Sequence, residues 1–373
     1  PPAGVSARAL DVYREKKPKV IVVMIYDALS WAHWDRYLAK LPIHARFRLN
    51  AREWTRTYLG HMSSSTTVSH AVLATGQPPK FTGIPINHTR TGMGTFEEVF
   101  IGDKPERLLV PTVADLYDAA HDNKPIIASF CSQSRAAIAM AGHGKKHPGG
   151  DADIVVWQNR HFGPLTTNED YWSMPDYLHN IGPDQLLAEL PNEFFRGLPV
   201  RNHRQLFRSP HNIKIGERFI NALLENEPFG EDNLTDLMFI NQKVLDNIAH
   251  RMTADTEHFQ EAMDALDTFM GDLLNNLNTR FGDEYMLILT SDHGFGPGLP
   301  SPKKQTDARR IDLSTALSSV NAKLGVDGLV EDIQYLNVYL NEERLAQSGK
   351  TLKEICYAFS SYDWVEHCLT KQD

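Results

Sequence analysis

Acidic residues and histidines follow three apolar runs of this sequence. These residues are Asp27, Asp246, His250, Asp292 and His293. Three carboxylates in one site repel one another strongly unless cations lie between them. Mixed Asp and His ligation is typical of Zn²⁺, whereas Mg²⁺ and Ca²⁺ prefer oxygen ligands alone. If the fold brings the five side chains together, they therefore indicate a zinc site.

Each of these residues, taken alone, also has a purely structural interpretation. Asp27 could cap a following helix, because aspartate side chains accept hydrogen bonds from the first N–H groups of helices. Asp246 and His250 lie four residues apart, a spacing that suits an ion pair on a helix surface. The pair Asp292-His293 is harder to explain in this way, because charged groups beside a buried strand need partners.

A candidate nucleophile lies in the stretch SSSTTVSHAVLATG at 63–76, where five hydroxyl residues precede a segment of small apolar residues. Ser and Thr are common N-cap residues. The local sequence therefore leaves two interpretations open, a helix cap or a hydroxyl that attacks a substrate.

Five apolar and largely β-branched runs predict buried strands, and helical patterns lie between them. The clearest helix covers 258–277, where apolar residues recur every three or four positions. Strands that alternate with helices predict an α/β fold with a mainly parallel sheet flanked by helices. Ligands bind at the carboxyl ends of such strands, so the candidate residues would meet there. The runs lie at 20–26, 126–131, 152–157, 234–241 and 285–291.

Two segments differ from this pattern. The segment 158–212 is rich in Asn, His, Pro and aromatic residues and predicts a loop-rich, cap-like insertion. The segment 311–373 contains helical and strand-like patterns and predicts a small α+β subdomain. We therefore expect an α/β domain that carries the site over 18–310, followed by this subdomain.

Composition excludes several classes of protein. The chain has 373 residues, a formal charge of -9 and 42% hydrophobic residues, which are typical of a soluble globular protein. Its Lys and Arg residues do not cluster as binding of a nucleic-acid polymer requires. No run of about 18 apolar residues predicts a membrane span, and three scattered cysteines are too few for a disulfide framework. The chain begins without Met, so a leader could have been removed, which favours a periplasmic or secreted protein.

Five motifs resemble those of the alkaline phosphatase superfamily and occur in the same order. The similarity is greatest to its phosphodiesterase and nucleotide pyrophosphatase branch and to the related bacterial phosphate-irrepressible phosphatases. It covers the chain from about residue 18 to about residue 370. The motifs are Asp27 after the first strand, TTVSHAVLATG beginning at Thr66, GQPPKFTGIPIN ending at Asn87, Asp246-x-x-x-His250, and TSDHG at 290–294.

The resemblance implies an alkaline-phosphatase-like fold and a zinc-dependent hydrolase of phosphoric esters. Thr66 would attack phosphorus to give a phospho-threonine intermediate, and Asn87 would hydrogen-bond a phosphoryl oxygen. Two Zn²⁺ ions would be bound. The resemblance assigns Asp27, Thr66, Asp292 and His293 to one ion, and Asp246, His250 and a third ligand to the other.

The sequence departs from the family pattern at two places. The family has a further zinc-binding His downstream of the Asp-His-Gly motif, and the only His after His293 is His367, in the dissimilar context DWVEHCLTKQD. We expect the last ligand to lie beyond Asp373. The segment CSQSRAAIAMAG resembles one in which the phosphate-irrepressible phosphatases carry Lys-x-Arg, and here the pair is Gln133-x-Arg135.

These departures bear on the substrate. Arg135 can contact a phosphate in a bidentate manner, but the missing Lys charge weakens recognition of a second negative charge. A small phosphodiester or nucleotide-type substrate is therefore preferred over a phosphomonoester. A non-catalytic binding protein of the same fold is the alternative that the missing His suggests. A sulfatase is disfavoured, because no formylglycine context surrounds Thr66. The sequence leaves the oligomeric state open.

Overall fold

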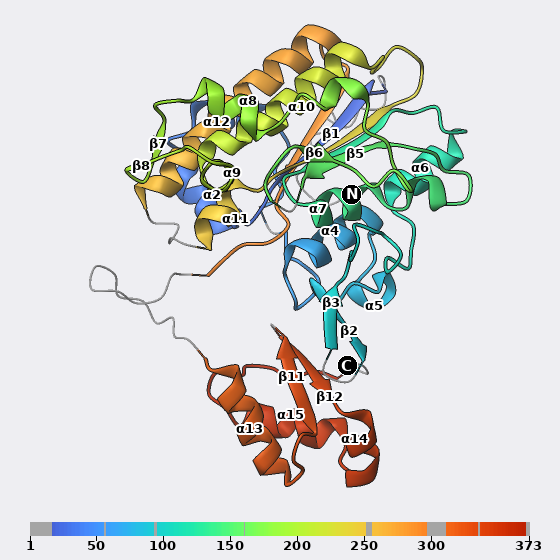
Figure 1. Ribbon diagram of the computed structural model, residues 1–373, viewed down its shortest axis with the longest axis vertical. Coiled ribbons are helices and arrows are strands. Elements are labelled where there is room, and N and C mark those ends of the chain that lie inside the picture. Colours follow the sequence, from blue (N-terminus) through green and yellow to red (C-terminus); the bar gives the residue numbers. More distant parts are fainter. Residues whose placement is uncertain are drawn as a thin grey trace. The chain divides into compact units, whose positions relative to one another are not determined.

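Figure 1 shows a computed structural model of the protein. The structure describes residues 17–55, 57–92, 95–159, 161–250, 256–296, 311–334 and 336–370. They form two compact units, which we describe separately. The larger unit contains the described residues up to Asn87 and from Val99 to 296, and the smaller unit contains the segment His88–Glu98 and the described residues from 311 onward.

A six-stranded sheet forms the centre of the larger unit, in the order β10-β1-β9-β4-β5-β6. Its first five strands are parallel, and only β6 pairs in the antiparallel sense. Each of the five apolar runs forms one of the parallel strands, so the predicted α/β fold with a mainly parallel sheet is confirmed. The strands are β1 (Val20–Tyr26), β4 (Ile127–Cys131), β5 (Ile154–Gln158), β6 (Leu165–Thr166), β9 (Asp236–Gln242) and β10 (Tyr285–Thr290).

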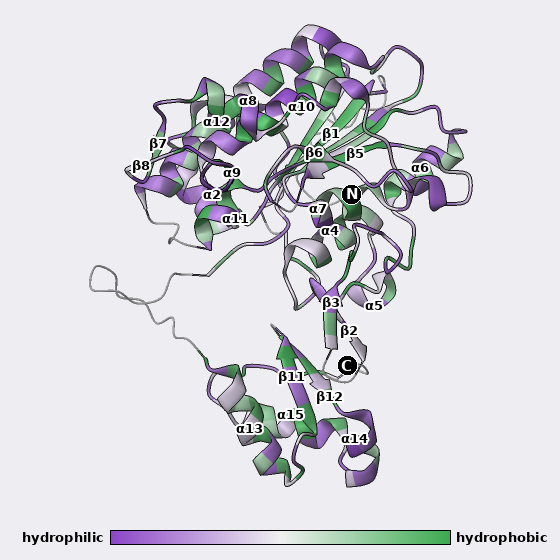
Figure 2. Ribbon diagram, viewed as in Figure 1, coloured by the Kyte–Doolittle hydropathy of each residue, from purple (hydrophilic) through white to green (hydrophobic). Residues whose placement is uncertain are grey.

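Helices cover both faces of this sheet (Figure 1). Alternate side chains of β1, such as Val22 and Met24, share one apolar cluster with α10 (Ile213–Asn226) and α12 (Glu257–Phe281), whereas Ile25 faces the cluster on the other side. Figure 2 shows the strands as the most continuous hydrophobic segments. Burial on both faces explains why these runs lack a polar alternation. The helices on the second face are α4 (Thr66–Thr75), α6 (Val113–Ala120) and α7 (Ser134–Ala141).

The segment 158–212 consists of short elements between longer loops. Three of its leucines, Leu178, Leu186 and Leu206, are buried in the same apolar cluster as α10 and α12. The elements that follow β5 up to residue 212 are β6, η2 (Asp176–Leu178), α8 (Pro183–Glu189), β7 (Phe194–Phe195), β8 (Leu198–Pro199), α9 (His203–Phe207) and η3 (Pro210–Asn212). The larger unit also contains α2 (Trp31–Leu38), α3 (Pro42–Asn50), α5 (Pro79–Thr82), η1 (Gly144–Lys146) and α11 (Val244–Ala249).

The smaller unit combines two hairpins with three helices. Arg90 of the first hairpin forms an ion pair with Glu331 and donates a hydrogen bond to the carbonyl of Leu340. The Phe96 ring packs edge-on against Tyr339, with 4.8 Å between the ring centroids. The elements are β2 (His88–Gly92), β3 (Thr95–Glu98), α13 (Leu313–Leu324), β11 (Val330–Gln334), β12 (Asn337–Leu340), α14 (Glu342–Ser348) and α15 (Leu352–Ser360).

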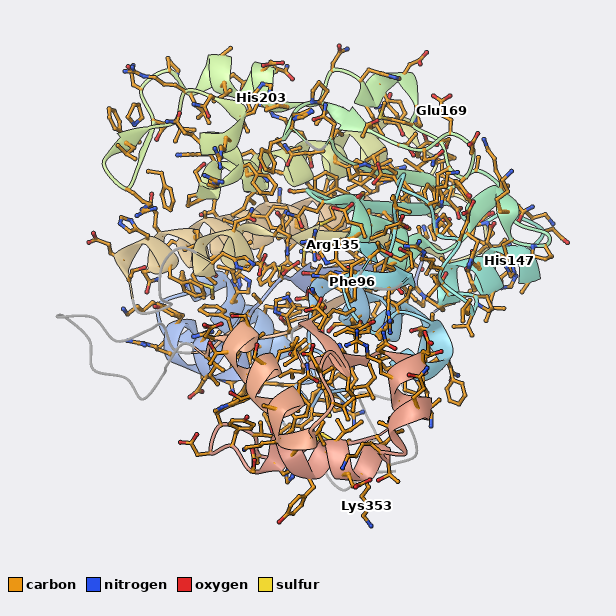
Figure 3. The ribbon with its side chains drawn as sticks, turned by 60° about the horizontal axis from the view of Figure 1, so that its bottom comes forward. Phe96, Arg135, His147, Glu169, His203 and Lys353 are labelled. Carbon is orange, nitrogen blue, oxygen red and sulfur yellow. A yellow bond between two sulfur atoms is a disulfide. The ribbon has the colours of Figure 1, made fainter. Side chains whose placement is uncertain are left out.

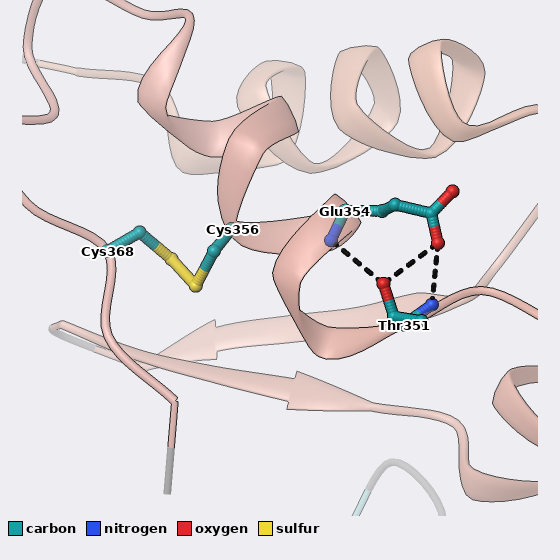
Figure 4. The surroundings of a disulfide bond; sticks show 4 residues. All are labelled: Thr351, Glu354, Cys356 and Cys368. Carbon is teal, nitrogen blue, oxygen red and sulfur yellow. Dashed lines mark hydrogen bonds between the residues drawn. A yellow bond between two sulfur atoms is a disulfide. The ribbon is translucent and has the colours of Figure 1, made fainter. Parts of the chain in front are cut away.

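A disulfide joins Cys356 on α15 to Cys368 (Figure 4). The bond closes a short loop at the end of the smaller unit and restricts the unfolded chain there. The same helix begins at a capping box in which Thr351 and Glu354 satisfy each other's backbone N–H groups. This pair was not expected, because three scattered cysteines do not indicate a disulfide framework.

Among the residues that the structure describes, no helix is both long and apolar enough to cross a membrane.

A series of buried hydrogen bonds fixes α3 and α12 to the sheet. The hydroxyl of Tyr26 lies 2.9 Å from Nε2 of His44, and Nδ1 of His44 lies 2.7 Å from Asp267 on α12. Asp267 also accepts hydrogen bonds from the backbone N–H groups of Ile43 and His44 at the start of α3. Because Tyr26 immediately precedes Asp27, this series helps to hold the end of β1 in place.

We predict that Asp267→Ala lowers the free energy of unfolding by about 3 kcal/mol, because it leaves two backbone N–H groups and an imidazole without an acceptor. Urea denaturation measures the change. Asp272→Ala on the exposed face of the same helix is the matched control and should change stability by less than about 0.5 kcal/mol. Equal effects of the two substitutions would contradict this account of α12.

Candidate active site

Four adjacent strands bring polar side chains to one edge of the sheet. The order β10-β1-β9-β4 places the carboxyl ends of these parallel strands side by side, which is where ligands bind in such sheets. The residues just beyond these ends are Asp292 and His293 after β10, Asp27 after β1, Lys243 and Asp246 after β9, and Gln133 and Arg135 after β4.

Asp27, Thr66, Asp292 and His293 converge at this edge. Nε2 of His293 lies 3.4 Å from Asp27 Oδ1, 3.4 Å from Asp292 Oδ2 and 3.3 Å from Thr66 Oγ1. Both carboxylates are fully buried, and Thr66 is nearly so. The structure therefore brings together the four residues that sequence resemblance assigned to one metal ion.

Two carboxylate oxygens that face this group form no hydrogen bond. Asp27 Oδ1 and Asp292 Oδ2 are buried without a hydrogen bond, whereas Asp292 Oδ1 accepts from the N–H groups of Ala28 and His293. Nδ1 of His293 lies 2.9 Å from the carbonyl of Gly294, so its N–H donates there and the lone pair of Nε2 points away from that bond. Unpartnered carboxylate oxygens beside an imidazole lone pair are the donor set that a cation such as Zn²⁺ accepts. These residues fit one cation.

The two carboxylates perturb each other's protonation. Burial would raise the pKa of Asp27, but Lys243, His293 and His70 outweigh burial and hold that pKa at about 2. Burial, and then the negative charge of Asp27, raise the pKa of Asp292 to about 7. A positive charge between the carboxylates would relieve this repulsion.

Thr66 is the first residue of helix α4. Its predecessor Ser65 occupies the N-cap position, yet Ser65 does not cap the helix with its side chain. Instead, Oδ1 of Asn87 accepts hydrogen bonds from the Thr67 N–H at 3.2 Å and from the Ser65 hydroxyl at 3.1 Å. The Thr66 hydroxyl is therefore not needed as a cap, and it lies at the positive end of the helix dipole, where anions are favoured.

Two further buried residues hold this arrangement, and the sequence did not reveal their role. His70 is one helical turn after Thr66; its Nδ1 lies 2.7 Å from the Thr66 carbonyl, and its Nε2 lies 2.8 Å from Nδ2 of Asn241. Asn241 also donates to Asp27 Oδ2 at 3.1 Å. Burial lowers the pKa of His70 to about 4, so it is a neutral imidazole that positions α4 against β9. The sequence feature that could have indicated this role is the histidine in TTVSHAVLATG, because it lies four residues, or about one helical turn, after Thr66.

Lys243 is a further unexpected member of the site. Its side chain is completely buried, and its Nζ lies 2.9 Å from Asp27 Oδ2, 2.7 Å from Asp246 Oδ2 and 3.0 Å from Thr66 Oγ1. Burial alone would lower the pKa of Lys243, but Asp27 and Asp246 raise it above its usual value. The side chain is thus an ammonium group. A lysine directly after the apolar run 234–241 was the available signal, because a buried charge at a strand end requires counter-charges.

Asp246 and His250 do not form a second group of this kind. Asp246 Oδ2 forms an ion pair with Lys243. Asp246 Oδ1 lies 3.4 Å from Nε2 of His250, whose side chain is 75% exposed. No third Asp, Glu, His or Cys joins this pair to make a cation cluster in the described part of the chain. The residues as arranged do not fit the second zinc ion that the sequence predicted. His367, the other histidine considered, lies in the smaller unit with an exposed side chain beside Glu366.

Arg135 lies among the elements of the larger unit, away from its outer rim (Figure 3). It follows β4 at the start of α7, and its charge acts on Lys243. Its Nε and the Oε1 of Gln133 are buried without hydrogen-bond partners. Both are therefore unsatisfied polar atoms close to this edge of the sheet.

Comparison with known proteins identifies the family. A family model described as type I phosphodiesterase / nucleotide pyrophosphatase matches residues 21–350. The chain belongs to this family. The resemblance to the alkaline phosphatase superfamily is thereby confirmed, and the protein is a hydrolase in the class that acts on phosphoric esters.

Individual proteins are distantly similar to this chain. A protein of Myroides odoratus named calcium-transporting ATPase is 23% identical, over 88% of this chain and 70% of its own length. Alkaline phosphatase PafA of Elizabethkingia meningoseptica is 20% identical, over 91% of this chain and 72% of its own. A crystal structure of wild-type PafA superposes with a TM-score of 0.79 at 18% identity, covering 94% of this chain and 77% of that chain. The fold is therefore alkaline-phosphatase-like.

We predict that Zn²⁺ raises the thermal midpoint of the metal-stripped protein, because a ligand that binds only the folded state stabilises it by mass action. His293→Ala should abolish most of this shift, since Nε2 of His293 faces both unpartnered carboxylate oxygens. His161→Ala, an exposed histidine of the same unit, is the control and should keep the shift. Differential scanning fluorimetry measures all three proteins, and a full shift in His293→Ala would refute the assignment.

Proposed function

We propose that the protein hydrolyses phosphodiesters by attack of Thr66 on phosphorus, with a zinc ion held by Asp27, Asp292, His293 and Thr66. The observation that carries this proposal is the position of Thr66 Oγ1. It lies 3.3 Å from His293 Nε2, beside two buried carboxylates with unpartnered oxygens and at the start of α4. Zinc is the proposed ion because mixed Asp and His donors are typical of its sites.

A cation bound by these side chains would lower the pKa of the Thr66 hydroxyl and so supply a nucleophile at neutral pH. Thr66 Oγ1 forms a bond to phosphorus, the bond between phosphorus and the leaving oxygen breaks, and that oxygen takes a proton to leave as an alcohol. Water then attacks the phospho-threonine, the bond from phosphorus to Thr66 Oγ1 breaks, and Thr66 regains its proton. The two steps together add one water to one ester bond.

Asn87 is suited to bind a phosphoryl oxygen. Because its Oδ1 accepts from Ser65 and from the Thr67 N–H, the orientation of the amide is set and Nδ2 remains as a donor. The start of α4 supports negative charge at the same place. Asn87 would therefore stabilise the charge that accumulates on the phosphoryl oxygens during attack.

The charges near Arg135 favour a diester over a monoester. Arg135 supplies one positive group after β4, while its neighbour Gln133 supplies only a neutral amide. A diester carries one negative charge, and a monoester dianion carries two. Arg135 beside a neutral amide suits the former, so a small diester or nucleotide-type substrate is proposed and a phosphomonoesterase is the second candidate.

We also propose a periplasmic or secreted location. The disulfide between Cys356 and Cys368 supports it, because structural disulfides persist in oxidising compartments.

Turnover of bis-p-nitrophenyl phosphate tests the reaction. We expect Thr66→Ala to lose at least about 10³-fold in kcat, because the nucleophile is absent, while Thr66→Ser retains measurable activity. EDTA should abolish turnover, and added Zn²⁺ should restore it. Wild-type activity in Thr66→Ala would exclude Thr66 as the nucleophile. Faster turnover of p-nitrophenyl phosphate would favour the monoesterase, and no turnover of either ester would favour the binding protein.

Asn87→Asp separates the two functions of this residue. The substitution keeps the acceptor for the Thr67 N–H and adds a negative charge at the start of a helix, so stability should be unchanged or slightly higher. It removes the Nδ2 donor and repels the phosphoryl group, so kcat/KM should fall by about 10²-fold.

Steady-state kinetics and the thermal midpoint are to be measured on the same sample. Asn275→Asp on the exposed face of α12 is the control for the added charge. If Asn87→Asp kept normal kcat/KM, Asn87 would have a structural role only.

A further inference from the structure

We infer that the ammonium group of Lys243 takes the place of a second metal ion, so that the site works with one divalent cation and one lysine. This inference deepens the proposed function and rests on it. It departs from the two zinc ions that the sequence predicted, and it follows from where Lys243 lies.

The surroundings of Lys243 match an ammonium group fully. The side chain is completely buried, and an ammonium group has three N–H donors. The structure provides three acceptors within 3.0 Å, which are Asp27 Oδ2, Asp246 Oδ2 and Thr66 Oγ1. A buried charge is tolerated only when it is paired and hydrogen-bonded in this way. These three contacts therefore fix the ammonium group at this position.

One of these three acceptors, Asp246, is a ligand that the second cation would need, and the other two belong to the first cation group. Thr66 Oγ1 and Asp27 belong to the first cation group, so Nζ lies directly beside that group, where the second ion of a two-metal site would be. Asp246, the first residue predicted to bind that second ion, has one oxygen engaged by Lys243. Among the residues that the structure describes, what remains is its other oxygen and the exposed His250, which are too few ligands for a closed zinc site.

The charges also balance with one metal ion. Asp27, Asp246 and Asp292 carry three negative charges when ionised. One divalent cation and the Lys243 ammonium carry three positive charges. Before substrate binds, a second divalent cation beside the buried ammonium would leave the three carboxylates with two positive charges in excess, which is unfavourable for buried groups.

Lys243 is thereby a catalytic residue, because its Nζ contacts the atom that attacks phosphorus. Its N–H donates to Thr66 Oγ1 and stabilises negative charge on that oxygen, both when Thr66 attacks and when the phospho-threonine bond breaks. A charge-assisted hydrogen bond of this kind needs no coordination position, so no further histidine ligand is required.

Metal content per chain tests the inference without relying on activity. The wild-type protein is saturated with Zn²⁺, and unbound zinc is then removed. Inductively coupled plasma mass spectrometry should find one zinc ion per chain. His250→Ala should also contain one, since this exposed residue would hold no metal. Two ions in the wild type, falling to one in His250→Ala, would overturn the inference.

Lys243→Met tests the role of the ammonium group, because methionine keeps an unbranched side chain and removes the charge. We expect kcat/KM to fall by at least about 10²-fold while one zinc ion remains bound, and Lys214→Met on the exposed surface of α10 should change neither value. Wild-type turnover in Lys243→Met would overturn the inference. If this variant does not fold, the metal contents of the wild type and His250→Ala decide alone.

The proposed function can fail separately. One zinc ion per chain with no turnover of any phosphoester by the wild type would reject the reaction. Turnover with two zinc ions would reject only the assignment of Lys243.

Discussion

The mutual repulsion of carboxylates at the carboxyl edge of the sheet constrains everything else in the site. Asp27 and Asp292 are fully buried, Asp246 is nearly so, and all three follow neighbouring parallel strands. Buried carboxylates this close cannot remain ionised without positive charge between them. Burial and the charge of Asp27 raise the pKa of Asp292. The positively charged side chains nearby therefore do not fully offset the repulsion between the carboxylates.

Contacts elsewhere in the larger unit hold the strands and helices of this edge in place. Strands β1 and β9 are buried on both faces, and the chain Tyr26–His44–Asp267 anchors the last residue of β1 to α3 and α12. On the opposite face, neutral His70 and Asn241 join α4 to Asp27. The result is a rigid frame in which Thr66 starts a helix without its hydroxyl serving as the cap, because Asn87 accepts from the Thr67 N–H instead. Positioning of this kind is what catalysis by a fixed nucleophile requires.

Much of this arrangement could be predicted from sequence because it depends on local patterns. The five apolar runs identified the parallel strands, and the rule that parallel strands share an edge explains why Asp27, Asp292 and His293 meet. The positions of the carboxylates in the sequence could not show which positive charge neutralises them. Lys243 was overlooked, since a lysine in a sequence is normally exposed, and only its three contacts reveal a buried ammonium. The pairing of Cys356 with Cys368 likewise depends on a turn that has no periodic signal.

A crystal structure with diffraction data at the zinc absorption edge would show how the charge at this site is neutralised. We expect one anomalous peak, bounded by Asp27, Thr66, Asp292 and His293, with Lys243 still in contact with Asp246. A second peak bounded by Asp246 and His250, with Lys243 displaced from Thr66, would contradict it.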